Sequence, residues 1–225
     1  MLDLHTHTVF SDGALIPAEL ARRAQAAGYN GVALTDHADS SNMGWILENQ
    51  LEGVRRMGPY LGVDVFVGIE LTHVPPPLIP DLVEKARGYG AALVVVHGET
   101  LAEPVPEGTN LEAIEAGADI LAHPGLISRE EAELAADRGV VLEISTRKGH
   151  CLSNGHVAQM ARQCGAHLII NNDAHAPGDF LSKEQRVRIA EGAGLHESEI
   201  LQAERCSRRL ADGMHLAGQG TEDKG

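Results

Sequence analysis

Seven short apolar runs alternate along the chain with segments of helical periodicity. Each run is apolar throughout, as expected of a strand that is covered on both faces. A strand, a helix and a further strand in succession require parallel pairing with a right-handed crossover. The runs are Leu2–Leu4, Gly31–Thr35, Val63–Ile69, Ala92–Val96, Asp119–Ala122, Val140–Ile144 and Leu168–Ile170. Seven such units without a strong break favour an α/β fold, a TIM-like (β/α)7 barrel, over an open sheet.

The segments between the runs carry helix start and stop signals. Three residue pairs have the spacing of a capping box: Thr109 with Glu112, Ser128 with Glu131, and Ser182 with Gln185. The last apolar-periodic segment, Glu197–Leu210, is expected to pack on the outside of the barrel. We predict one domain over residues 1–217 and a frayed polar tail over residues 218–225.

Composition argues against two classes of partner. The formal net charge is −14 and only seven residues are Phe, Trp or Tyr, so broad binding to extended nucleic acid or to anionic lipid is not expected. The start, MLDLHTHT, lacks the features of a signal peptide, and no apolar run is long enough to span a membrane. The three cysteines form no disulfide or metal pattern. We expect a cytoplasmic protein.

Histidine is abundant, with 12 in 225 residues, and many of these histidines lie at the ends of the predicted strands. Six of the seven predicted strands are followed within three residues by His, Asp or Glu. The carboxyl ends of parallel barrel strands converge on one mouth, where active sites lie. Imidazole and carboxylate together suit zinc, manganese or iron. The residues are His5, His7, Asp36, His37, Glu70, His97, His123, Asp173 and His175.

Two of these motifs have a spacing that suits a shared metal. In an extended strand the side chains at positions i and i+2 face the same side, so His5 and His7 can bind one ion. Asp173 and His175 repeat this spacing after the last strand. His73 and His150, in contrast, are expected to be ordinary hydrogen-bonded histidines.

Together these motifs resemble the polymerase and histidinol phosphatase (PHP) family. The matching stretches run in order from residue 5 to residue 175. They are His5-Thr-His7 with Asp12-Gly13, Thr35-Asp36-His37, Gly68-Ile69-Glu70, His97, Ala122-His123-Pro124 and Asp173-Ala-His175. The resemblance implies a distorted seven-stranded barrel with up to three divalent metal ions.

The resemblance also assigns the ligands. It places His5, His7, Glu70 and Asp173 around the first ion. It places His97 and His123 on the second, with Glu70 as a bridge, and Asp12, His37 and His175 on the third. Glu70, His97, His123 and Asp173 are the predicted catalytic residues, and Asp36 is expected to orient a ligand histidine.

The implied reaction is hydrolysis of a phosphate ester by a metal-activated hydroxide. Arg147 and Lys148, after the sixth strand, are the best-placed cations for phosphate binding, and Lys183 and Arg186 are weaker candidates. The leading substrate is a small phosphomonoester such as histidinol phosphate. His150 or His156 could act as the general acid.

Other functions remain open. The same metal site could serve a nucleotide phosphatase, a phosphodiesterase or an exonuclease. A metal-dependent amidohydrolase is less favoured, since no lysine stands at a strand end. A PHP domain can also be a non-catalytic accessory module. The sequence leaves open the native metals, the preferred ester and the oligomeric state.

Overall fold

The computed structural model describes the backbone of residues 1–219 and the side chains of residues 1–215, and its centre is a nearly closed barrel of parallel strands. Neighbours along the barrel follow the order β1-β2-β4-β5-β6-β7-β8. A parallel bridge between Thr6 and Ala174 joins β1 to the segment that follows β8. The strands are β1 (Leu2–Thr6), β2 (Gly31–Leu34), β3 (His37–Ala38), β4 (Asp64–Leu71), β5 (Leu93–His97), β6 (Ile120–Ala122), β7 (Val141–Ser145) and β8 (Leu168–Asn171). The predicted TIM-like barrel is confirmed.

One strand was not expected. β3 has two residues, continues from β2 after a short break, and pairs with β4 through His37 opposite Glu70. A two-residue strand is too short to give an apolar run, so the sequence pattern does not reveal it. Its pairing fixes His37 beside Glu70, which brings two predicted metal ligands together.

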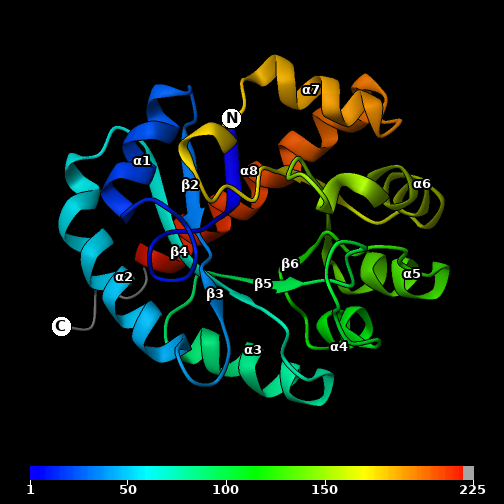
Figure 1. Cartoon of the computed structure of the whole chain (residues 1–225), viewed down its shortest axis with the longest axis horizontal. Coiled ribbons are helices and arrows are strands. Elements are labelled where there is room, and N and C mark those ends of the chain that lie inside the picture. Colours follow the sequence, from blue (N-terminus) through cyan, green and yellow to red (C-terminus); the bar gives the residue numbers. More distant parts are fainter. Residues whose placement is uncertain (220–225) are drawn as a thin grey trace.

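Helices surround the barrel (Figure 1). Outward strand residues such as Ile69, Val94 and Leu142 pack with these helices in one buried apolar cluster. The helices are α1 (Pro17–Ala26), α2 (Met43–Met57), α3 (Ile79–Gly88), α4 (Thr109–Glu115), α5 (Arg129–Arg138), α6 (Asn154–Cys164), α7 (Lys183–Gly192) and α8 (Glu197–Gln219). This layer covers the outer face of the strands, as continuous apolar strands require.

The last helix does not simply join the outer layer. Cys206, Ala211 and Met214 of α8 belong to the same buried cluster as the inward side chains Leu93 and Ile120. In Figure 1, α8 crosses behind the strands. The expected exterior position is therefore wrong, because the open end of a barrel exposes apolar side chains that an amphipathic helix can cover.

Two of the three predicted capping boxes are present, at Ser128 with Glu131 and at Ser182 with Gln185. The third is wrong. Gly108, with φ +92°, precedes the helix, and the Thr109 hydroxyl donates to the Pro106 carbonyl at 2.7 Å.

The chain end differs from the expected tail. Residues 218 and 219 still belong to α8, and the remainder of the predicted tail, 220–225, lies outside the described residues. Among the described residues, no helix combines the length and apolarity needed to cross a membrane. The single domain over residues 1–217 stays a prediction.

Candidate metal centre

The carboxyl half of the barrel interior is polar. On β4, Phe66 faces inward in the apolar cluster, and Glu70 lies four residues further along the same face. On β5, Leu93 and His97 are related in the same way. Because side chains alternate between the two faces of a strand, the register that buries Phe66 and Leu93 also directs Glu70 and His97 into the mouth.

A shift in the pairing register of β1 directs His5 into the mouth of the barrel. Regular pairing with β2 is interrupted between Asp3 and Thr6. Leu4 belongs to the interior apolar cluster, while the adjacent His5 reaches the carboxylates at the mouth. Adjacent residues of a regular strand face opposite sides, so the bulge lets both Leu4 and His5 point inward.

His123 enters the mouth through an unusual backbone conformation. Ala122 faces the interior, so a regular strand would direct the next residue outward. His123 instead has φ +29° and points inward. Of the described non-glycine residues, those with positive φ are His73, His123 and Asp173, and all three lie at the mouth. Such outliers cluster at functional sites.

The four predicted ligands of the first metal lie next to one another and are buried. His5 Nε2 lies 3.2 Å from Glu70 Oε1, and His7 Nε2 lies 3.2 Å from Asp173 Oδ1. All four of these atoms are buried without a hydrogen-bond partner. Buried polar atoms left unpaired are costly, and a divalent cation would pair all four. The residues present therefore fit a metal.

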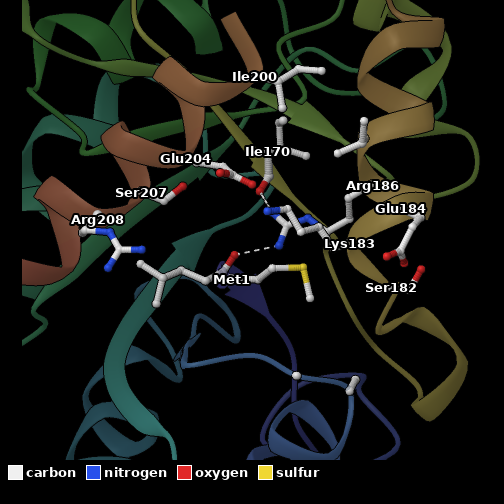
Figure 2. Close-up of a pocket in the computed structure, with 14 residues that line it drawn as sticks. Met1, Ile170, Ser182, Lys183, Glu184, Arg186, Ile200, Glu204, Ser207 and Arg208 are labelled. Carbon is white, nitrogen blue, oxygen red and sulfur yellow. Dashed lines mark hydrogen bonds between the residues drawn. The ribbon is translucent and has the colours of Figure 1, made fainter. Parts of the chain in front are cut away.

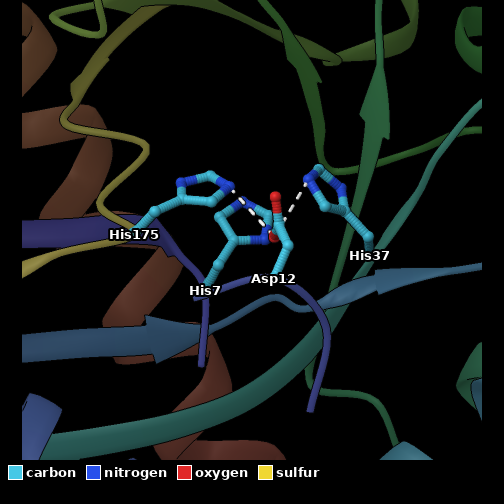
Figure 3. Close-up of side chains that lie close together, drawn as sticks. All are labelled: His7, Asp12, His37 and His175. Carbon is cyan, nitrogen blue, oxygen red and sulfur yellow. Dashed lines mark ion pairs between the residues drawn. The ribbon is translucent and has the colours of Figure 1, made fainter. Parts of the chain in front are cut away.

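A second group of ligands lies nearer the surface, and Figure 3 shows how its side chains converge. Asp12 Oδ1 lies 3.2 Å from His175 Nε2 and 3.5 Å from His37 Nε2. The His7 ring stacks on His175, with 4.0 Å between the centroids. Asp12, His37 and His175, the predicted third-metal ligands, thus come together, and their free ligand atoms lie within 4.8 Å of one another and of His7.

The predicted ligands of the second metal are also adjacent. The rings of His97 and His123 meet edge to face at 4.5 Å between centroids. His123 Nε2 lies 3.7 Å from Glu70 Oε1 and 3.8 Å from Asp173 Oδ2. His123 also lies within reach of His5 and Asp173 as a ligand group.

Burial sets the charge state of these groups. Burial and the nearby His37 lower the pKa of His7 well below its ordinary value, and burial and His97 do the same to the pKa of His123. Burial lowers the pKa of His5 too, but the carboxylates of Glu143 and Glu70 outweigh it and raise that pKa. Neutral imidazoles, as at His7 and His123, are the form that binds a metal.

The sequence interpretation missed a buried carboxylate behind the site. Glu143 Oε2 lies 2.8 Å from His5 Nδ1 and accepts a hydrogen bond from Asn171 Nδ2 at 3.0 Å. With a proton on Nδ1, His5 presents Nε2 to the mouth, as metal-binding histidines do. A fully buried glutamate inside the apolar run of β7 was the signal that could have identified it.

The contacts of Asp36 differ from those expected of a residue that orients a ligand histidine. It accepts hydrogen bonds from the Thr8 amide at 2.8 Å, the Thr8 hydroxyl at 2.9 Å and the Ser11 hydroxyl at 2.7 Å. It therefore holds the loop that leads to Asp12 rather than orienting a histidine. His37 Nδ1 lies 2.6 Å from Glu70 Oε2 and 2.7 Å from the Thr72 hydroxyl.

Of the four candidate phosphate-binding cations, Arg147 and Lys148 lie at the mouth of the barrel. Arg147 Nη1 donates to the Asp173 carbonyl at 3.2 Å, and the guanidinium lies 3.7 Å from the Asp173 carboxylate. Lys148 is exposed beside it and lines a small pocket with Arg147 and Asp179. Both stay predictions for substrate binding.

The weaker pair is not at the mouth. Lys183 and Arg186 line a pocket with Met1, at the amino end of β1 (Figure 2). Arg186 donates to the backbone carbonyls of Leu2 and Ile170. Its position 11 residues after His175 suggested the mouth, but the chain between them crosses to the other end of the barrel.

Comparison with known proteins identifies the family of this chain. A PHP domain model matches residues 3–161. The chain belongs to the PHP domain family. It is 48% identical over 200 residues to an uncharacterized protein of Methanocaldococcus jannaschii, covering 88% of this chain and 92% of that protein. It is 30% identical to ribonuclease P protein component 3 of Methanosarcina mazei, covering 89% and 84%.

Two further likenesses bear on this PHP domain. A probable phosphatase of Thermoanaerobacter sp. is 26% identical, with 89% of both chains covered. A chain in the cryo-EM structure of archaeal ribonuclease P with mature tRNA superposes with a TM-score of 0.72, covering 96% of this chain and 92% of that chain at 16% identity. The last likeness is one of fold.

Proposed function

We propose that this PHP domain is a metal-dependent phosphoesterase that hydrolyses a small phosphomonoester, such as histidinol phosphate. The observation that carries the proposal is the convergence of nine histidine and carboxylate side chains on one barrel mouth, with buried ligand atoms left unpaired. The likeness to a probable phosphatase supports the same reaction class. We propose up to three divalent ions, with zinc, manganese and iron all compatible with this ligand set.

The proposed reaction depends on the metal ions and on residues of the chain that hold the metal ligands in place. Bound divalent ions would activate a water molecule and neutralise charge on the phosphoryl oxygens. Glu143 holds the His5 ring, and Asp36 holds the loop that carries Asp12. We propose that Arg147, beside Asp173, binds a phosphate oxygen at the rim. The apolar floor beneath the ligands keeps bulk water from the lower side of the site.

The experiment that tests this function is phosphate release by metal-reconstituted protein from a panel of esters. The panel contains histidinol phosphate, nucleoside monophosphates and a phosphodiester, each with and without a chelator. Chelator-sensitive release from one monoester supports the proposal, and selective release from histidinol phosphate supports that substrate. Preference for the nucleotides or the diester would replace the substrate but keep the chemistry. An intact metal site without turnover of any ester would contradict the proposal.

A second candidate function has its own support. Ribonuclease P protein component 3 of Methanosarcina mazei matches nearly the whole chain at 30% identity, so the domain could act as a module of a ribonucleoprotein, with RNA and protein partners in place of a small molecule. The net charge of −14 and the full ligand set favour the enzyme. Binding of tRNA to the metal-loaded protein, measured by native gel shift at physiological salt, tests the alternative, because an accessory module would bind and the proposed small-molecule enzyme would not.

A further inference from the structure

Three residues outside the nine predicted ligands, His73, Glu103 and His150, lie close to His97. Glu103 Oε2 lies 3.2 Å from His97 Nε2 and 3.1 Å from His73 Nε2. Glu103 Oε1 lies 3.6 Å from His150 Nε2. The His150 ring also stacks on the His123 ring, with 4.1 Å between the centroids. The second-metal region is thus richer in ligands than the family resemblance implies.

The rings of His97 and His150 are held in the way that metal-binding histidines are held. His97 Nδ1 lies 3.2 Å from the Gly98 carbonyl, and an N–H donated there leaves the Nε2 lone pair free. His150 Nδ1 lies 2.8 Å from the Thr100 hydroxyl in a buried contact. Each ring is fixed at Nδ1 and presents Nε2 to the same space, as His5 does with Glu143 behind it.

The ligand atoms around His97 form two overlapping sets. His97, His123 and His150 offer atoms within 4.8 Å of one another, and so do His73, His97 and Glu103. One imidazole nitrogen has one lone pair and binds one ion, so the free Nε2 of His97 cannot serve two separate ions. The two sets therefore meet at one metal position beside His97 Nε2, and the ligands that they add to His97 and His123 are His150 and Glu103, with His73 as the partner of Glu103.

The proposed ligands of the second metal position differ in how exposed their side chains are. The side chain of His150 is 7% exposed, whereas that of Glu103 is 40% exposed, on the loop between β5 and α4. The imidazoles of His97, His123 and His150, with the carboxylates of Glu70 and Glu103, would fill the coordination positions of the ion, and a site closed in this way has no position for a substrate. Opening it requires one ligand to move away, and Glu103 is the exposed one.

We propose that His150 is a third imidazole ligand of the second metal position, and that Glu103 is a displaceable carboxylate ligand whose place a phosphate oxygen takes. In the exchange one anionic oxygen leaves and another arrives. His73, 3.1 Å from Glu103 Oε2, gives the released carboxylate a partner at the rim. The ligand role of His150 is independent of catalysis, and the displacement by phosphate rests on the proposed function.

Titration of metal-free protein with Co²⁺ tests the role of His150, with bound metal counted by elemental analysis and the ligand field read from visible absorption. For His150→Ala we expect one cobalt ion fewer per chain at a free Co²⁺ concentration that fills the wild type. His156→Ala is the control, because His156 lies in the same region but bonds the Ile127 carbonyl. Wild-type stoichiometry and spectrum in His150→Ala would overturn the assignment.

A second variant keeps this test independent of folding. Thr100→Val removes the hydroxyl behind His150 and preserves the shape of the side chain. We expect weaker binding of the same cobalt ion, by about 10-fold or more, as for loss of a contact that orients a ligand. Unchanged affinity in this variant, with His150→Ala folded and fully loaded, would leave no role for His150. Neither readout depends on turnover, so failure of the phosphoesterase proposal would not affect it.

Glu103→Gln tests the displacement, with inorganic phosphate as the probe. The amide is a poor ligand, so we expect phosphate to bind more tightly, by about 10-fold, and the cobalt spectrum without phosphate to differ from that of the wild type. Glu107→Gln removes the same charge from the same loop and controls for simple electrostatics. Equal effects in the two variants, or weaker phosphate binding in Glu103→Gln, would overturn the displacement.

Discussion

Along β4 the inward side chains are Phe66 near the amino end and Glu70 near the carboxyl end, and along β5 they are Leu93 and His97. The two halves of the interior are therefore built by the same strands in the same register. The lower half, at the amino ends of the strands, is filled with apolar side chains and covered by α8. The upper half leaves buried nitrogen and oxygen atoms unpaired. Burial in the lower half stabilises the fold, and the upper half costs stability that a bound cation can offset.

The largest effect is expected from His123→Ala, at the upper end of β6. Removing this imidazole should lower the metal content, and should lower kcat/KM for a phosphate ester by about 10²–10³-fold because the second ion would stabilise the charge of the transition state. The barrel should stay folded, because the apolar half is untouched. Steady-state kinetics with elemental analysis is the measurement. Wild-type activity would remove His123 from the site.

The matched change at the lower end of the same strand is Ile120→Ala. Ile120 is fully buried in the interior cluster, so its truncation should cost about 2–5 kcal/mol of unfolding free energy. Denaturant unfolding measures this cost. Under conditions where the variant is folded, metal stoichiometry should equal that of the wild type. Loss of metal from folded Ile120→Ala would show that the two halves are not independent.

Glu143→Gln should produce an intermediate effect at the boundary between the halves. Loss of the carboxylate that holds His5 Nδ1 should weaken metal binding by about 10–100-fold, with little change in the number of sites at saturation. Metal titration measures it. The control is Glu133→Gln, which changes an exposed glutamate on α5. The role of Glu143 would be refuted by equal affinities in the two variants.

Arg147→Ala should affect the rim alone. We expect KM for a phosphate ester to rise about tenfold, equivalent to ~1.4 kcal/mol of binding free energy, with metal content near that of the wild type. Kinetics and elemental analysis on one preparation separate the two. A constant KM would make Arg147 a structural partner of Asp173.

The smallest effect should come from an ion pair in the helix layer. The hydrogen bond from Arg162 lowers the pKa of Glu199 from 4.5 to about 2. A carboxyl with a lowered folded-state pKa contributes stability above its ordinary pKa and loses it as the pH falls through the folded value. Because the pair is near solvent, Glu199→Gln should cost about 0.2–1 kcal/mol at pH 7.

Denaturant unfolding at pH 7 and at lower pH checks this prediction. The difference between Glu199→Gln and the wild type should shrink as the pH approaches 2. Glu197→Gln, two positions earlier in α8, is the control. A difference that does not depend on pH would contradict the ion-pair explanation and leave only a helix-packing effect.

The parallel barrel and most of the donors at its mouth could be predicted from patterns along the chain. Apolar runs and helix periodicity are local patterns, and strand direction alone brings the ends of β1, β4 and β5 together. That convergence predicted that His5 and Glu70 would lie in the same mouth, but the bulge on β1 decides that their side chains meet at 3.2 Å.

Tertiary structure decided the remainder. The bulge that directs His5 inward, the left-handed backbone of His123, and the closure of the barrel by α8 have no local signature in the chain. The contact of Thr100 with His150 joins residues 50 positions apart. Loop paths and backbone irregularities depend on the packing of the whole barrel, since no short segment specifies which distant side chain will lie beside it.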